Sequence, residues 1–381
     1  MIVRKVQSAR DLRKFIDFGY DHYRGDPHWV PPLRLDVKHT LNPRKNAFFE
    51  HGRIQCFLAE DENGRTLGRI AAIINGMHLE KYDDSVGFFG FFETVDDFDV
   101  AVKLMGAAEK WLIEYGMSGV RGPVNPSMND VAGLLVEGFD KPPFVMMPYN
   151  KEYYPDFLAR LGYERAMTMW AWFIHRKHGR FEKLWRGRDL IVRRYPDLRV
   201  RTIDMSRFDE EAAAIRDIYN EAWSDNWGHV PMTEAEFRQI AKSMKQIIEP
   251  ELVILVEDRG QPIAFAITLP NVNQALKHVK DGRLLPTGLF QLFMRLKFGG
   301  VTEARTLLMG VRKGYRGRGL DSVLVADTVR NSYTLGFSAG ELSWVLESND
   351  VLINQLEAIG AVRDKEYVML EKSLDHVGSA R

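Results

Sequence analysis

A glycine-rich basic turn at 312–319 holds the residues best suited to chemistry. It reads Arg312-Lys313-Gly314-Tyr315-Arg316-Gly317-Arg318-Gly319. Four cationic side chains stand within seven residues, and the glycines leave backbone N–H groups accessible to a ligand. A strand is predicted before the turn (304–311) and a helix after it (320–335), so the positive end of that helix faces the turn. The pattern predicts a phosphate-bearing ligand; the alternative is a solvated basic turn.

Other common sites fit this chain poorly. No Gly-Lys-Ser/Thr follows the turn, and Gly317-x-Gly319 continues into Asp321 and Ser322, which excludes the Walker A and Rossmann patterns. The 52 Lys and Arg residues balance 52 Asp and Glu residues, so net charge gives no reason to expect nucleic acid as a partner. The single cysteine, Cys56, excludes a disulfide framework, and its strand-like surroundings predict a buried thiol. No metal site is predicted from the His, Asp and Glu spacing.

The elements around the turn predict the order β-α-α-β-β-β-α-β-α-β for the second half of the chain. Thr233 and Glu236 form a capping box at the start of one helix. Strands are expected at 198–203, 252–257, 262–269, 304–311, 341–346 and 366–370, and helices at 209–223, 233–248, 320–335 and 351–359.

The first half repeats these elements in the same order. Each half carries an insertion of similar size, at 126–150 and at 284–300. We therefore predict two domains, 1–177 and 198–381, joined by a basic linker helix at 178–197. Three pairs of glycines mark equivalent turns or helix ends: Gly64 with Gly260, Gly116 with Gly336, and Gly162 with Gly360.

The linker region, 176–201, has ten Lys and Arg residues against three acidic ones. A solvated linker helix anchored by Phe181 and Trp185 is the favoured interpretation. The alternative is contact with an acidic membrane surface or an anionic ligand.

The Arg316-Gly317-Arg318-Gly319 segment, in this order of elements, resembles the acyl-CoA-binding motif of the GNAT N-acyltransferase superfamily, Arg/Gln-x-x-Gly-x-Gly/Ala. Asp321 departs from it, and its charge is compatible with a nearby pyrophosphate only if the side chain turns away. The strings at 26–32, 87–93 and 148–155 resemble a bacterial group of tandem GNAT proteins that includes ceramide synthase-like acyltransferases. The resemblance implies an α/β (α+β) fold of two GNAT-like domains, each a mixed, mostly antiparallel sheet flanked by helices.

The same resemblance implies acyl-CoA as the co-substrate, bound in the C-terminal domain. The corresponding turn of the N-terminal copy, 92–99, has four acidic residues and no glycine, which would repel phosphates. That copy is expected to bind no coenzyme. The implied coenzyme-binding residues are Val311, Arg312, Lys313, Gly314, Arg316, Gly317, Arg318, Gly319 and Leu320.

In this superfamily an amine attacks the thioester directly, which needs a base for the ammonium and an acid for the leaving thiolate. We predict Glu347 as the base, with Asn349 beside it; capping of the next helix is the equal alternative. The usual helix tyrosine is replaced by Leu356. Tyr367 is the substitute acid by residue type, and a structural strand aromatic is the alternative.

Acceptor contacts are expected from Asn226, Trp227 and His229, in a loop that resembles the superfamily's acceptor loop, and from Tyr149 and Asn150. The insertion at 287–298 has Leu289, Leu292, Phe293 and Leu296 at helical spacing. Core or interdomain packing is its default interpretation, and an apolar lid for a long acyl chain or an interfacial contact with lipid is the alternative.

The sequence thus predicts transfer of an acyl group from CoA to an amine, with a long-chain acyl donor and a lipid (sphingoid) amine favoured. Acetylation of a small polar amine and a catalytically inactive coenzyme- or lipid-binding protein are the alternatives. No run is apolar enough to span a bilayer, so a cytoplasmic protein is expected, with peripheral contact at the inner membrane face as an option.

Overall fold

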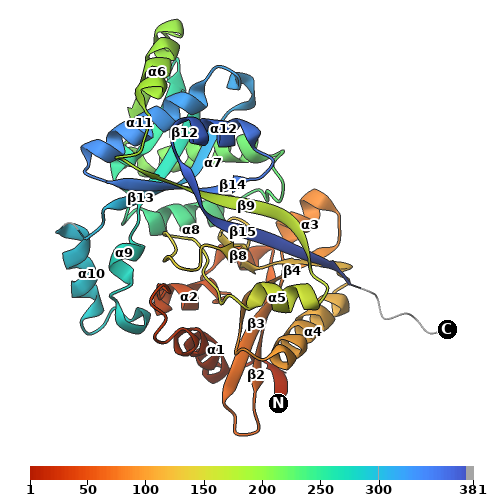
Figure 1. Ribbon diagram of the computed structural model, residues 1–381. Coiled ribbons are helices and arrows are strands. Elements are labelled where there is room, and N and C mark those ends of the chain that lie inside the picture. Colours follow the sequence, from red (N-terminus) through yellow and green to blue (C-terminus); the bar gives the residue numbers. More distant parts are fainter. Residues whose placement is uncertain (299, 375–381) are drawn as a thin grey trace. The chain divides into compact units, whose positions relative to one another are not determined.

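The computed structural model describes residues 1–298 and 300–374, and its elements form two compact units (Figure 1). Unit 1 comprises Met1–Met169, Leu276–Phe290 and Lys365–Arg381, and unit 2 comprises Trp170–Ala275 and Gln291–Asp364. The last residues of the predicted C-terminal domain, 375–381, lie outside the described residues.

Unit 1 is built on a sheet with the order β1-β2-β3-β4-β5-β15. Neighbouring strands are antiparallel except β4 and β5, which are parallel. The strands are β1 (Ile2–Lys5), β2 (Arg53–Glu60), β3 (Thr66–Ile74), β4 (Val86–Thr94), β5 (Gly119–Gly122), β6 (Val124–Asn125), β7 (Val131–Ala132), β8 (Leu134–Glu137) and β15 (Val362–Ser373). The helices are α1 (Ala9–His22), α2 (Arg34–Thr40), α3 (Gly76–Tyr82), α4 (Phe98–Glu114) and α5 (Tyr154–Arg160).

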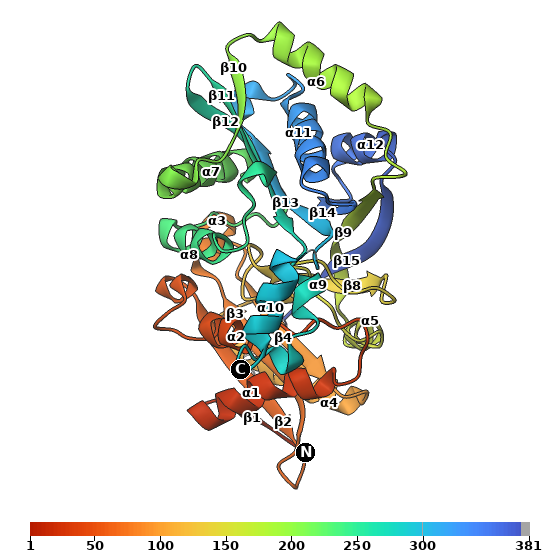
Figure 2. The same cartoon turned by 90° about the vertical axis from the view of Figure 1, so that its left-hand side faces the viewer.

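Unit 2 repeats this plan with the order β9-β14-β13-β12-β11-β10, and here β13 and β14 are the parallel pair (Figure 2). The strands are β9 (Glu164–His175), β10 (Leu198–Thr202), β11 (Val253–Asp258), β12 (Gln261–Pro270), β13 (Glu303–Val311) and β14 (Ala339–Leu346). The helices are α6 (Glu182–Arg194), α7 (Phe208–Trp223), α8 (Glu234–Met244), α9 (Asn273–Leu276), α11 (Leu320–Thr334) and α12 (Asp350–Ala358). Helix α10 (Gly288–Lys297) crosses the division between the units, as do β9, α9 and β15.

The two units exchange their last strands. β9, the last strand of the N-terminal half, lies beside β14 of unit 2, whereas β15, the last strand of the chain, pairs antiparallel with β5 of unit 1. The contact units are therefore not contiguous in sequence. The domain boundaries at 177 and 198 stay a prediction. The three glycine pairs lie at equivalent places in the two halves: Gly64 and Gly260 lie in hairpin turns, Gly116 and Gly336 follow α4 and α11, and Gly162 and Gly360 follow α5 and α12.

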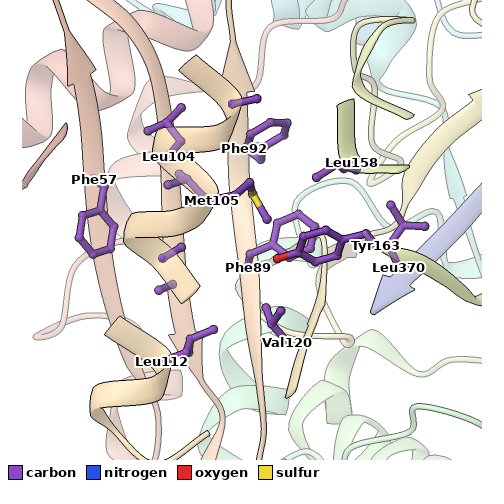
Figure 3. Packing of buried hydrophobic residues seen from close by; sticks show 14 of the residues in the cluster. Phe57, Phe89, Phe92, Leu104, Met105, Leu112, Val120, Leu158, Tyr163 and Leu370 are labelled. Atoms are coloured by element: carbon purple, nitrogen blue, oxygen red, sulfur yellow. The ribbon is translucent and has the colours of Figure 1, made fainter. Parts of the chain in front are cut away.

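Helix α4 covers one face of the unit 1 sheet with its apolar side chains. Its buried positions, among them Leu104, Met105 and Leu112, recur at helical spacing on one face. Figure 3 shows these side chains beside Phe57 of β2 and Phe89 of β4, and all five residues belong to one buried cluster. Cys56, as predicted, is buried, and burial raises the pKa of its thiol to about 12.

In unit 2, α11 packs its Leu320, Val323 and Leu324 on β11 and β12. The linker helix α6 contacts α11 (Figures 1 and 2). Phe181 is buried just before α6, and Trp185 packs against the same cluster, so the predicted anchoring is confirmed.

Helix α10 corrects one default expectation. Of the four positions at helical spacing, Leu289, Phe293 and Leu296 are exposed rather than packed in a core. The helical periodicity was sufficient to place the element but did not indicate what its apolar face contacts.

Candidate coenzyme site in unit 2

The parallel strands β13 and β14 form a fork. They are paired only from Glu303 with Ala339 to Thr306 with Leu342, and the register ends there although both strands continue. Against β12, the register shifts between Ile267 and Thr268, which leaves Leu307 of β13 as an extra residue at the point where the fork opens. Backbone groups of the open strands can therefore face a ligand rather than a neighbouring strand.

The basic turn lies at the open end of β13. A short 3-10 turn at Lys313–Tyr315 leads to Gly317 and Gly319, whose φ angles are 75° and 79°. These left-handed values favour glycine. Gly319 is the N-cap residue of α11 and, as a glycine, has no side chain to cap the first-turn amides. The helix therefore presents unused N–H donors and the positive end of its dipole.

The cations of the turn are held against the end of α7. Arg312 Nη1 donates to Glu221 Oε2 at 2.5 Å, and the Lys313 amide donates to Glu221 Oε1 at 2.9 Å. Lys313 Nζ lies 2.8 Å from Asp225, and Arg316 Nη2 donates to the carbonyl of Ala222 at 2.5 Å. Residues at the end of α7 and just after it thus position the turn.

Electrostatics at this contact favour charged side chains. Burial alone would raise the pKa of Glu221, but hydrogen bonds from Arg312 and the Lys313 amide, together with their charges, hold that pKa below its usual value. The hydrogen bond from Lys313 likewise lowers the pKa of Asp225. Sequence reasoning missed both carboxylates; their only signal was their position just before and within the predicted acceptor loop.

Asp321 turns toward α12. Its Oδ2 accepts a hydrogen bond from the Gln355 side chain. The Asp321 carboxylate, which departs from the GNAT motif, is thus bonded to a neighbouring helix. This orientation is the one in which its charge is compatible with a nearby pyrophosphate.

Helix α6 lies close to the same turn. A Cβ atom on Gly319 would lie 2.6 Å from Ile191 Cδ1. Arg188 holds α6 to α11, with Nη2 3.0 Å from Asp327 Oδ2, and Arg318 stands over the Tyr315 ring at 4.6 Å. The Leu320 side chain is buried, so only the backbone of this predicted coenzyme residue can face a ligand.

The predicted catalytic residues lie in different settings. Glu347 is exposed directly after β14. Asn349 caps α12 by accepting a hydrogen bond from the Leu352 amide at 3.2 Å, as in the alternative interpretation. Tyr367 is fully buried in unit 1, opposite Leu135 of β8. The geometry of Asn349 and Tyr367 is that of structural residues, and their roles in catalysis stay predictions.

The predicted acceptor residues divide between the units. In unit 2, Asn226 and Trp227 are half-buried in the loop after α7, and His229 is buried with its ring 5.3 Å from that of Tyr219. In unit 1, Tyr149 donates to Asp26 Oδ1 at 3.3 Å.

Asn150 holds β8 in place. Its Oδ1 accepts from the Leu135 amide at 2.7 Å, and its Nδ2 donates to the Leu135 carbonyl at 3.1 Å. Because Asn150 is buried and bonded to this backbone, its polar atoms serve the fold.

Unit 1 has the same fork, but its own chain fills it. β4 and β5 are paired only from Val86 with Gly119 to Phe88 with Arg121. Beyond this point the short strand β6 enters: the Phe91 amide donates to Asn125 Oδ1 at 2.6 Å. A Cβ atom on Gly90 would lie 1.6 Å from the Val124 carbonyl oxygen, which shows how closely β6 approaches.

The acidic turn of unit 1 is also engaged internally. Glu93 accepts hydrogen bonds from Tyr23 Oη at 2.7 Å and Tyr154 Oη at 2.8 Å. Burial raises the pKa of Glu93 above its usual value, although Arg69 and the two tyrosines oppose the shift. Asp97 caps α4 by accepting from the Asp99 amide.

A small cavity lies beside the fork of unit 2. Its volume is about 40 Å³, and Thr306, Met309, Leu342, Val325 and Tyr333 contribute to its mainly apolar lining. Such a volume holds about one or two water molecules. Among the described residues, no group of three or more His, Cys, Asp or Glu side chains is arranged to hold a metal ion.

The comparisons with solved structures define the class of fold. The tandem GNAT protein from the clavulanic acid biosynthesis pathway aligns over 98% of both chains, with a TM-score of 0.59 and 11% identity. A GCN5-related N-acetyltransferase from Sphaerobacter thermophilus covers 98% of this chain and 95% of its own, with a TM-score of 0.52 and 12% identity. The chain therefore has the tandem GNAT fold, and the predicted fold class is confirmed. No family model matches it.

Two curated relatives define the family. Bacterial ceramide synthase of Caulobacter vibrioides is 38% identical over 375 residues, which are 97% of this chain and 96% of that protein. Protein YghO of Escherichia coli is 36% identical over 377 residues, which are 98% of this chain and 95% of that protein. The chain belongs to this family of tandem GNAT-superfamily proteins, as the strings at 26–32, 87–93 and 148–155 predicted.

Proposed function

We propose that the protein is an acyl-CoA-dependent N-acyltransferase whose coenzyme binds at the fork of unit 2. The observation that carries this proposal is the difference between the two forks. β6 fills the fork of unit 1, whereas the fork of unit 2 opens toward a basic, glycine-rich turn at an uncapped helix. The N-terminal copy then has no coenzyme of its own.

The residues present fit the chemistry of a coenzyme A ester. The pyrophosphate would accept hydrogen bonds from the amides of Gly319 and Leu320 at the start of α11, with the charge of Arg316 nearby. Arg316 would exchange its present acceptor, the Ala222 carbonyl, for a phosphate oxygen. The pantetheine arm carries amide groups, which suit the unpaired edges of β13 and β14 beyond Thr306 and Leu342.

When bound, the coenzyme supplies an acyl thioester. The acceptor amine must first lose a proton, which Glu347 would accept directly or through water. The amine nitrogen then forms a bond to the acyl carbon and gives up its second proton to water as the carbon–sulfur bond breaks. The thiolate takes a proton from water or, as the resemblance implies, from Tyr367. The amide of Leu307, the extra residue of β13, lies at the opening of the fork, where a donor could stabilise the oxyanion.

The acyl group and acceptor favoured by family membership are a long-chain acyl group and a lipid amine, because one relative is named a ceramide synthase. Acetyl transfer to a small polar amine is the second candidate. The 40 Å³ cavity at the fork favours it, since that space suits a short acyl group and must widen to admit a long chain.

Calorimetric titration tests coenzyme binding. The wild-type chain should bind CoA, acetyl-CoA or palmitoyl-CoA, and the better acyl ligand assigns the chain length. Arg316→Ala should weaken binding by about tenfold or more, the value of one charge-assisted contact. Arg330→Ala, at the other end of α11, is the matched control and should leave binding unchanged. No heat with any of the three ligands would reject the proposal.

Turnover separates an enzyme from a binding protein of the same fold. Release of free CoA thiol over many turnovers, with a sphingoid base or a small amine, is expected from the wild-type chain. Glu347→Gln should reduce the rate without changing CoA affinity. Binding without turnover for every amine would favour the inactive binding protein, and equal turnover in Glu347→Gln would reject the base assignment.

A further inference from the structure

Helix α10 and its flanks carry the densest exposed apolar surface in the described part of the chain. The described residues include fifteen large apolar side chains that are exposed, and seven of these fifteen lie within residues 285–298. Phe290 and Phe298 are 67% and 68% exposed, and Leu285 is 77% exposed. The other four members of this apolar patch are Leu289, Phe293, Met294 and Leu296. A contiguous patch of this kind marks an interaction site.

The segment that bears the patch is a long connection between two adjacent strands. β12 ends at Pro270 and β13 begins at Glu303, whereas hairpin connections usually have about two to five residues. The two ends of the segment are hydrogen-bonded to each other in unit 2. The Asn271 amide donates to the Glu303 carbonyl at 2.8 Å, and the Thr302 amide donates to Gln274 Oε1 at 2.8 Å. Because its two ends are held together, the segment leaves the sheet without breaking the pairing of β12 and β13.

The segment is also anchored within unit 1. Arg34 Nε donates to the Asp281 carbonyl at 2.8 Å. Gly282 is buried, and a Cβ atom there would lie 2.2 Å from the Pro32 carbonyl oxygen. The start of α10 is thus fixed, while the side chains after it face outward.

The charged residues of the same segment are almost all positive. Residues 277–298 contain five Lys and Arg residues and one acidic residue, Asp281. Exposed Arg283 lies two residues before the patch, and exposed Arg295 lies within it, between Met294 and Leu296. Phenylalanine and leucine side chains with flanking cations are the composition of a helix that lies in the interface of an anionic bilayer.

We propose that α10 binds the surface of an anionic phospholipid bilayer, with the apolar patch inserted below the headgroups. Each of the three phenylalanines of the patch adds apolar area to the inserted face, and Arg283 and Arg295 meet lipid phosphates. Membrane binding would bring the protein close to a lipid amine in the bilayer. Only this consequence rests on the proposed function; the binding of α10 to the bilayer does not. Among the helices of the described residues none is long and apolar enough to cross a membrane, so the contact is peripheral.

Co-sedimentation of the full chain with vesicles tests the proposal. The wild type should bind vesicles of phosphatidylglycerol and phosphatidylethanolamine more tightly than vesicles of neutral phosphatidylcholine. The triple variant Phe290→Ser/Phe293→Ser/Phe298→Ser should lose about tenfold or more of this partitioning. The control Ile2→Ser/Leu35→Ser/Val102→Ser removes three exposed apolar side chains elsewhere and should bind as the wild type does.

A fluorescence readout keeps the test independent of folding defects in the serine variant. The chain has one cysteine, Cys56, so Met294→Cys in a Cys56→Ala background can be labelled at a single position. An environment-sensitive dye at 294 should brighten with anionic vesicles, and the same dye at Leu35→Cys should not.

The results separate three outcomes. Equal brightening at both positions, or no vesicle binding by the wild type, would overturn the proposal. Self-association that depends on the three phenylalanines, without vesicle binding, would assign the patch to a second copy of the chain and also overturn it. Neither measurement uses coenzyme or acceptor, so failure of acyl transfer leaves the outcome unaffected.

Discussion

Three glycines of the basic turn allow its backbone to be tested one feature at a time. Gly314 lacks a left-handed φ angle and has open space where a Cβ atom would lie. Gly317 has a φ angle of 75° in open space. Gly319 has a φ angle of 79°, and its Cβ position is 2.6 Å from Ile191 Cδ1. Alanine should therefore add neither strain nor a clash at 314, backbone strain at 317, and both backbone strain and a clash at 319.

The expected changes in the free energy of unfolding follow in that order. Gly314→Ala should be neutral or stabilise by up to about 1 kcal/mol, because alanine restricts the unfolded chain. Gly317→Ala should destabilise by about 1 kcal/mol, the left-handed penalty less the unfolded-state gain. Gly319→Ala should cost about 2 kcal/mol, because the end of the Ile191 side chain must also move.

Urea unfolding followed by circular dichroism measures these differences as shifts of the midpoint at constant slope. An Ile191→Ala background should remove the extra cost of Gly319→Ala and reduce it to that of Gly317→Ala. Equal effects at Gly314 and Gly317, or an unchanged cost of Gly319→Ala in the Ile191→Ala background, would refute this geometry of the turn and of α6.

Three further predictions concern single hydrogen-bonding residues. Asn150→Ala should destabilise the protein by about 2 kcal/mol in urea unfolding, because the buried Leu135 backbone loses its partners; an unchanged midpoint would contradict this. Asn349→Ala should cost about 1 kcal/mol, whereas Asn349→Asp should keep the cap and the stability; lost turnover with retained stability in Asn349→Asp would instead favour catalysis. Because its folded pKa is depressed, Glu221 should stabilise the protein fully above its ordinary pKa of 4.5 and lose this effect as pH falls through the lower folded value. The stability advantage of wild type over Glu221→Gln should therefore shrink in acid, and an advantage that grows in acid would refute the sign.

Local signals in the sequence were enough to place most elements of unit 2. The capping box of Thr233 and Glu236 is present at the start of α8, and the predicted helix 320–335 is α11 at Leu320–Thr334. Both rest on interactions between residues close in sequence, which pattern reasoning can see. The left-handed φ angles of Gly317 and Gly319 are also local, because they depend on the conformational freedom of the glycine itself.

The features that sequence patterns could not predict depend on residues far apart in the chain. β9 and β15 follow equivalent glycine-ended helices, so nothing local decides which sheet each one joins. The filling of the unit 1 fork depends on Asn125 meeting Phe91, and the docking of the turn depends on Glu221 meeting Arg312. The exposure of α10 is of the same kind, because periodicity shows an apolar face but not its partner.

A crystal structure of the protein grown with CoA would test the central claim most directly. The account predicts electron density that runs from the amides of Gly319 and Leu320, past Arg316, into the fork between β13 and β14. Density at the acidic turn of unit 1, beside Glu93 and Asp97, or binding that leaves the fork of unit 2 empty, would contradict it.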